Sequence, residues 1–189
     1  MKITLKFLNK YNACNEGVEF VKQNNVIGLE APDFIKKLIE LDKTEWANWL
    51  IVRVLDKINC VRYAVFAAEQ VLPIFEEEYP DDNRPRKAIE AAKAYIENPC
   101  EATSKAVVVA ENAANAAWSA RVMAGKRTAA ESAANAAAHA AESAANIFTV
   151  YASAFAAANT AYAAAYADCD KILIKIVNYG IELLRETSK

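Results

Sequence analysis

The stretch AAESAANAAAHAAESAAN, residues 129–146, decides the fold of this chain. It contains the heptapeptide AAESAAN twice at an offset of 11 residues, which is about 3.67 residues per helical turn, so each repeat position returns to nearly the same face of a straight helix. Alanine, the strongest helix former, accounts for 40 of the 189 residues, and 30 of them lie between residues 102 and 167. Since the chain has only four Gly and five Pro, the sequence predicts an all-α fold.

The alanine-rich half is too long to remain one straight helix. Residues 102–167 would extend about 100 Å at about 1.5 Å per residue, further than a domain of this size can cover. We therefore predict a turn at Gly125–Thr128, a second break near Asn146–Thr149, and long antiparallel helices between the breaks. Asp168 or Asp170 can cap a final helix. Aromatic residues spaced for one helix face predict a core-facing stripe: Phe148, Tyr151, Phe155, Tyr162 and Tyr166.

Short amphipathic helices are predicted to fill the first half of the chain. Apolar residues at helical spacing, together with Asn, Thr, Asp and Pro at expected starts, place them from Asn12 or Asn15 to residue 23, and over residues 31–41, 44–54, 56–79 and 84–97. Pro73 should kink or end the fourth of these near Leu72. We expect residues 100–189 to pack on residues 1–99, giving one compact multi-helix bundle over residues 1–189.

The N-terminus allows two interpretations. Ile3, Leu5 and Phe7 alternate with polar residues, as in a strand, and a short strand could pair with residues 26–29. An extended segment that packs Ile3 and Phe7 onto helices fits the pattern equally well.

Charge and cysteine content narrow the functional classes. There are 22 Lys+Arg and 24 Asp+Glu residues, 14 against 16 before Pro99 and 8 against 8 after it, so neither half has the basic character that nucleic-acid binding requires. The N-terminus is too polar for a signal peptide, and no stretch reads as a membrane span. We therefore expect a cytoplasmic protein. Its four cysteines, which have no CxxC spacing, should be free and mostly buried.

Catalytic signatures are weak. The single histidine, His139, lies among alanines with no nucleophile motif beside it, so a polar surface or interface role is favoured over a general base. The sequence shows no nucleotide-binding, hydrolase or metal-ligand spacing, and we expect no catalytic residues, cofactor or metal. Trp46, Trp49 and Trp118 are interpreted as core or helix-interface anchors, and charged residues within apolar helices as ion-pair partners: Arg53, Arg62 and Glu69.

The densest charge pattern lies in the segment EEEYPDDNRPRK, residues 76–87. A solvated turn is the simpler interpretation, and a partner-binding surface is the alternative, because a tyrosine is enclosed by charges. If the chain binds a protein, we predict that the contacts are made by Glu76, Glu77, Glu78, Tyr79, Asp81, Asp82, Arg84 and Arg86.

The segment WANWLIVRVLDKINCVRYAVFAAEQVLPIFEEEYPDDNRPRKAIEAA, residues 46–92, carries a family resemblance. Its W-x-x-W-L helix and its V-L-P-I-F-E…Y-P-x-D-x-R-P-R turn, together with Ala13-Cys14 and the Ala/Tyr-rich tail, resemble bacterial and phage immunity proteins similar to the fifth class from polymorphic-toxin loci. The resemblance implies an all-helical protein that binds and neutralises a partner without catalysis.

Three functional hypotheses follow. The first is an inhibitor that covers the functional surface of a toxin, and the second is a phage counter-defence inhibitor of a host immune protein. The third is a structural homo-oligomer assembled through alanine faces. For the first two, we expect charge reversal at Asp81 and Asp82 to weaken binding with little change in melting temperature.

Overall fold

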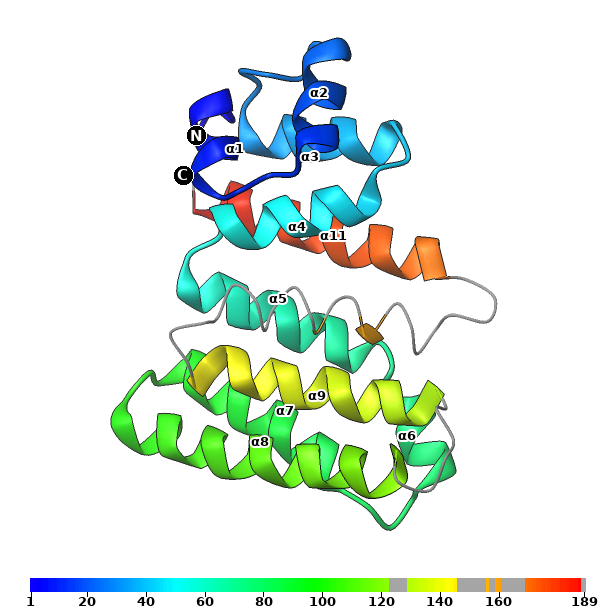
Figure 1. The fold of residues 1–189 in the computed structure, drawn as a ribbon. Helices are drawn as coiled ribbons and strands as arrows, with labels where there is room; N and C mark the ends of the chain where they lie inside the picture. Colours follow the sequence, from blue (N-terminus) through cyan, green and yellow to red (C-terminus); the bar gives the residue numbers. More distant parts are fainter. Residues whose placement is uncertain (123–128, 146–155, 157–158, 161–168, 188–189) are drawn as a thin grey trace.

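The protein is all-α. A computed structural model describes residues 1–122, 129–145, 156, 159–160 and 169–187 (Figure 1). These residues contain ten helices and no strand, which confirms the predicted fold class. The helices are α1 (Leu5–Lys10), α2 (Asn15–Gln23), α3 (Ala31–Glu40), α4 (Thr44–Val54), α5 (Lys57–Glu69), α6 (Leu72–Glu78), α7 (Arg84–Glu97), α8 (Glu101–Val122), α9 (Ala129–Ala145) and α11 (Cys169–Glu186).

Helix α5 lies between two clusters of buried side chains. One side of α5 contributes Cys60 and Tyr63 to a cluster that includes residues of α1–α4 and α11. Its other side contributes Val61 and Ala64 to a cluster formed with α6–α9. Figure 1 shows the same order, with α1–α4 and α11 on one side of α5 and α6–α9 on the other. One helix therefore links the amphipathic and alanine-rich parts of the bundle.

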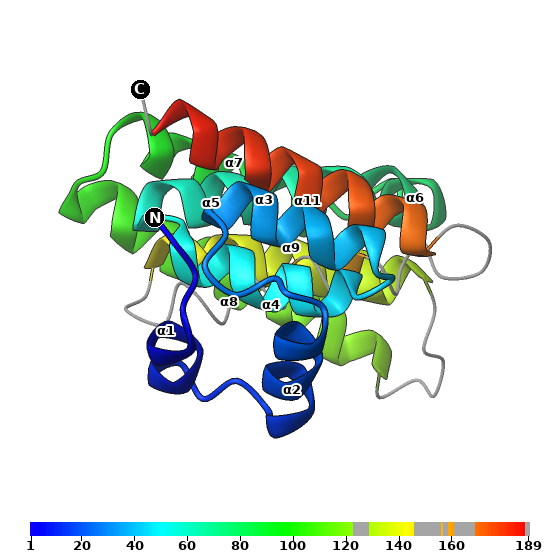
Figure 2. The ribbon, with the colours of Figure 1, turned by 90° about the horizontal axis from the view of Figure 1, so that it is seen from above.

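The final helix returns to the first half of the chain. It packs against α3, α4 and α5 and buries Ile176, Val177 and Ile181 there (Figures 1 and 2). Gly180 allows the close approach, because a Cβ atom added to it would lie 2.7 Å from Ile51 Cδ1 and 2.9 Å from Tyr63 Cε2.

Alanine packing dominates the other cluster. Helices α8 and α9 lie side by side and antiparallel (Figure 1), and α9 also contacts α5, α6 and α7. Small side chains allow helix axes to approach closely, which explains why so many alanines of α9 are buried: Ala133, Ala134, Ala136, Ala137, Ala138, Ala140, Ala141 and Ala144. The predicted turn at Gly125–Thr128, the break at 146–149, the aromatic stripe and the Asp168 cap lie outside the described residues.

The strand interpretation of the N-terminus is wrong. Ile3 is fully buried and extended, and its N–H donates to Leu29 O at 2.9 Å while its carbonyl accepts from Gly28 N at 2.8 Å. A single bridge, Lys2–Glu30, is the only β pairing in the described residues. Helix α1 begins at Leu5, and the Thr4 hydroxyl accepts a hydrogen bond from Phe7 N. The alternative prediction, an extended segment that packs on helices, is therefore correct for residues 1–3 only.

Two further predictions need correction. Pro73 lies in the first turn of a new helix rather than at the end of the old one, since α5 ends at Glu69 and α6 starts at Leu72. Proline suits that position because a backbone N–H in the first turn has no acceptor within the helix, so proline loses no hydrogen bond there. The thiols are not mostly buried: Cys60 is buried, but Cys14 and Cys100 are exposed, and all three are free.

None of the helices in the described residues is long and apolar enough to cross a bilayer.

Candidate partner-binding surface

The eight residues singled out in the sequence lie on and beside the connection between α6 and α7. We call these residues, Glu76–Tyr79, Asp81, Asp82, Arg84 and Arg86, the charged turn. Two buried residues attach it to the bundle: Phe75, which is fully buried in α6, and Pro85, which is buried in the first turn of α7. The structure therefore brings the predicted residues together on one firmly anchored segment.

Asp82 and Arg84 form the first fixed element of the charged turn. Arg84 Nε donates to Asp82 Oδ1 at 2.8 Å and Nη2 donates to Oδ2 at 2.7 Å. The backbone N–H of Arg84 also donates to Asp82 Oδ1 at 3.2 Å. These contacts raise the pKa of Arg84, mainly through the side-chain hydrogen bonds. Asp82 therefore fixes both the Arg84 side chain and the backbone at the start of α7.

Glu76 and Arg86 form a second bidentate pair, which joins α6 to α7. Arg86 Nε and Nη2 donate to Glu76 Oε1 and Oε2, each at 2.6 Å, and this pairing raises the pKa of Arg86. Such exposed pairs contribute little to stability, typically below about 1 kcal/mol. Their planar two-point geometry instead restricts how α6 and α7 can present the turn.

Tyr79 and the remaining acidic residues complete the surface. The Tyr79 hydroxyl donates to Glu78 Oε1 at 2.8 Å, and its ring lies 5.2 Å from that of Phe75. Glu77 and Asp81 are exposed, and no cation of the described residues forms an ion pair with either. Since five carboxylates face two guanidinium groups that are already paired, the charged turn carries a net charge of −3.

Charge reversal is therefore a cleaner test at some positions than at others. Reversing Asp82 would break the contacts that hold Arg84 and the start of α7. The expected small effect on melting temperature thus fits Asp81 but not Asp82. Glu77 is a better second site for charge reversal than Asp82, because its side chain is exposed and forms no ion pair within the described residues.

The other charged residues noted in the sequence have structural partners. Arg62 Nη1 forms an ion pair with Glu186 at 2.9 Å, and Glu69 pairs with Lys93, as predicted. Arg53 places its guanidinium carbon 3.9 Å from the centroid of the Trp49 ring.

His139 is bonded within its own helix. Its Nδ1 lies 2.8 Å from Glu142 Oε2 one turn along α9, and this contact lowers the pKa of Glu142. Partial burial, followed by the nearby charge of Glu142, raises the pKa of Glu111 on α8. Within the described residues, no group of three or more His, Cys, Asp or Glu side chains is arranged to hold a metal ion.

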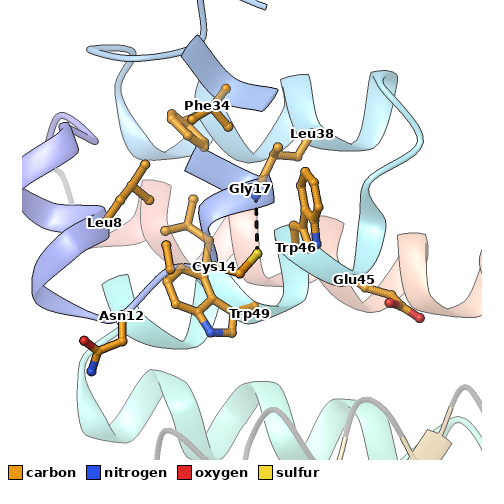
Figure 3. Close-up of a pocket in the computed structure, with 12 residues that line it drawn as sticks. Leu8, Asn12, Cys14, Gly17, Phe34, Leu38, Glu45, Trp46 and Trp49 are labelled. Carbon is orange, nitrogen blue, oxygen red and sulfur yellow. Dashed lines mark hydrogen bonds between the residues drawn. The ribbon is translucent and has the colours of Figure 1, made fainter. Parts of the chain in front are cut away.

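Sequence reasoning missed one further feature, a cavity of about 360 Å³ among α1–α4. Trp46 and Trp49, predicted to be core or interface anchors, are only partly buried and line it (Figure 3). The shared helix face of Trp46, Trp49 and Leu50 was the available signal. The cavity could not be inferred from it, because the opposite wall comes from three other helices.

The all-α bundle thus carries a net-negative turn that two bidentate ion pairs hold in place. The family model for Imm-5 like putative immunity proteins matches residues 51–178, and the chain belongs to this family. The matched range includes the whole charged turn. None of the curated proteins and none of the solved structures compared with the chain matches it.

Proposed function

We propose that this protein neutralises a toxin by binding it through the charged turn, without catalysis. The observation that carries the proposal is the family match, which spans α5–α9 and includes all eight residues of the turn. An immunity protein acts by occupying its toxin, so a surface with a fixed shape and charge is the feature that the function needs.

The geometry favours a basic partner. Both arginines of the turn are engaged by carboxylates of the turn, so Glu77 and Asp81 provide the charge available to a partner. Complementary charge accelerates association and discriminates against acidic partners. Tyr79, which lies between the acidic residues, supplies an aromatic group of the kind enriched at the centres of interfaces.

The fixed geometry of the charged turn also supports tight binding. Bidentate pairs at both ends of the turn reduce the conformational freedom that association would otherwise remove. A basic toxin with a functional cleft, such as a nuclease, is the partner class that this surface fits.

Co-expression tests the proposal. The candidate toxin, identified from the neighbouring gene or by capture from the source cell, is induced with and without this protein. We expect growth arrest to be relieved by the wild-type protein, and relief to be lost with Glu77→Lys/Asp81→Lys. Equal protection by the wild type and the double variant would exclude the charged turn. Protection should persist with Glu16→Lys, a control that changes charge by the same amount per site on α2.

Self-association is a second candidate function, favoured by one observation. Val108 and Val109 of α8 are 43% and 71% exposed, which is unusual for neighbouring apolar side chains on a helix. Sedimentation velocity at micromolar concentration tests it: a dimer abolished by Val109→Lys supports assembly through α8, and a monomer excludes it.

A further inference from the structure

We propose that the cavity among α1–α4, here called the tryptophan pocket, binds a neutral small molecule with an aromatic body the size of two fused rings. Figure 3 shows the pocket with the Cys14 thiol between Trp46 and Trp49, and with the Glu45 carboxylate directed away from both indole rings. Three properties of the pocket select this class of ligand: its size, its uncharged interior and its aromatic walls.

The size of the pocket suits a body of two fused rings. Its volume is about 360 Å³, whereas an engineered apolar cavity of about 150 Å³ is already large enough to bind benzene. The pocket also lies within the range of about 300–1,000 Å³ typical of small-molecule sites. Its walls are fixed by core packing, because Leu8, Phe34 and Leu50 are each at most 4% exposed. The shape therefore exists before a ligand arrives, which reduces the entropy lost on binding.

The interior of the pocket offers no charged partner within the described residues. Two cations lie against the indoles, with the Lys43 ammonium 5.0 Å from the Trp46 ring centroid and the Arg53 guanidinium carbon 3.9 Å from that of Trp49, but neither cation lines the pocket. Glu45 is the only charged residue of the lining, and its carboxylate is directed away from the indoles (Figure 3). A charged group inside would lose its hydration without gaining a partner. The pocket therefore favours a neutral ligand.

The walls favour an aromatic body over a saturated one. The lining includes three aromatic side chains and one sulfur atom, contributed by Phe34, Trp46, Trp49 and Cys14. Edge-to-face and offset contacts between aromatic rings each add a factor of about 2–10 in affinity beyond the burial of area. Sulfur also makes favourable contacts with ring edges, and the Cys14 Sγ is held in place by Gly17 N, which donates to it at 3.3 Å. A planar aromatic ligand thus gains contacts that a saturated ligand of the same skeleton lacks.

The tryptophan pocket is separate from the charged turn. Its lining residues lie between positions 8 and 50, before the matched range 51–178. Figure 1 shows α2 and α3 at the opposite end of the bundle from α6. Ligand binding in the pocket therefore does not rest on toxin binding, and either proposal can fail while the other stands.

Calorimetric titration with four compounds of one carbon skeleton tests the class of ligand. The probe, 2-naphthalenemethanol, is neutral and aromatic. Its analogues 2-naphthoate and 2-naphthylmethylamine carry a negative and a positive charge, and decahydro-2-naphthalenemethanol has no aromatic ring. We expect saturable binding of the probe with a dissociation constant of about 10 μM to 1 mM. Both charged analogues should bind at least about tenfold more weakly, and the saturated analogue at least about twofold more weakly, although it is the more apolar compound.

Protection of Cys14 from alkylation locates the bound probe. Saturating 2-naphthalenemethanol should slow the reaction of Cys14 with iodoacetamide, while Cys100, which is also exposed but does not line the pocket, reacts at an unchanged rate. Ala13→Phe, which fills part of the cavity, should weaken binding at least about tenfold. The matched control Ala106→Phe, on the exposed face of α8, should bind the probe as the wild type does. The thiol measurement uses the wild-type protein, so it decides the location even if Ala13→Phe fails to fold.

Four results would each overturn the proposal. The first is the absence of saturable binding of the probe up to about 2 mM. The second is an affinity for either charged analogue that equals or exceeds that for the probe, since the ligand would then not need to be neutral. The third is equal or tighter binding of the saturated analogue, which would remove the aromatic preference. The fourth is an unchanged rate of Cys14 alkylation at saturating probe, which would place the bound compound elsewhere.

Discussion

Gly180→Ala is the perturbation that tests the packing of the bundle most sharply. Gly180 lies within α11, where alanine is intrinsically favoured over glycine by about 1 kcal/mol. If α11 were only loosely attached, the substitution would therefore stabilise the protein. The structure predicts the opposite sign.

The magnitude follows from three distances. The new Cβ would lie 2.7 Å from Ile51 Cδ1, 2.9 Å from Ile51 Cγ1 and 2.9 Å from Tyr63 Cε2. Favourable carbon contacts lie at about 3.5–4.0 Å, so α11 or its neighbours must move by nearly 1 Å. Ile51 and Tyr63 are fully buried and have no free space to move into. Because all three contacts are shorter than 3.0 Å, the overpacking cost lies in the upper part of the usual range, at about 2–3 kcal/mol. This leaves a net loss of about 1–2 kcal/mol after the helix gain of about 1 kcal/mol.

Thermal and urea unfolding followed by circular dichroism measure the effect. A loss of about 1–2 kcal/mol corresponds to a decrease in Tm of about 2–8 °C for a chain of this size. Ile51→Val removes the nearest methyl group, so the double variant should be more stable than the sum of the two single changes implies. A Tm equal to or above that of the wild type for Gly180→Ala would refute the packing of α11 against α4 and α5.

Three more substitutions test other parts of the account. Ala136→Leu, at a fully buried position of α9, should lower the free energy of unfolding by about 1–3 kcal/mol because the larger side chain separates the helices. The control Ala106→Leu, on the exposed face of α8, should change it by less than about 0.5 kcal/mol. Similar urea midpoints for the two variants would contradict the alanine packing. Tyr63→Phe removes the buried donor to Asn48 Oδ1 (2.8 Å) and should lower the unfolding free energy by about 1–2 kcal/mol, and an unchanged urea midpoint would argue against this bond. Because the hydrogen bond with His139 lowers the pKa of Glu142 in the folded state, its carboxylate contributes stability above the ordinary pKa of the group, and that contribution is lost as the pH falls through the lowered value. Glu142→Gln should accordingly be less stable than the wild type near pH 6 and equally stable near pH 2; a pH-independent difference would contradict the assignment.

Local signals in the sequence were enough to predict most of the helix positions. Ala31-Pro32 marks the start of α3, Asp56 accepts from Asn59 N at 2.9 Å as the cap of α5, and α7 runs from Arg84 as expected. Each of these signals acts within one helical turn, so it can be recognised without knowledge of the rest of the fold.

The errors arose where tertiary contacts or unusual groups decide the structure. Alternation over Ile3, Leu5 and Phe7 is too short to distinguish a strand from a helix, and α1 forms because Leu8 and Phe7 pack on the core. Cys14 caps α2 with its sulfur at 3.3 Å from Gly17 N, a role expected of an asparagine.

The candidate surface was predictable in composition but not in geometry. The density of charge drew attention to residues 76–87, yet the pairing of Glu76 with Arg86 depends on how α6 and α7 meet. For the same reason the sequence could not separate Asp81, an exposed charge, from Asp82, which holds the start of α7. The tryptophan pocket needs four helices and was invisible to any local pattern.

The central claim, that the charged turn binds a basic toxin, is tested most directly by calorimetric titration of the purified toxin with the wild-type protein, Glu77→Lys/Asp81→Lys and the control Glu16→Lys. We expect a one-to-one complex whose dissociation constant rises at least about tenfold in the double variant and is unchanged in the control. Its dependence on salt should be as strong in the control as in the wild type and weaker in the double variant. Equal affinity of the wild type and the double variant at unchanged Tm would contradict the central claim.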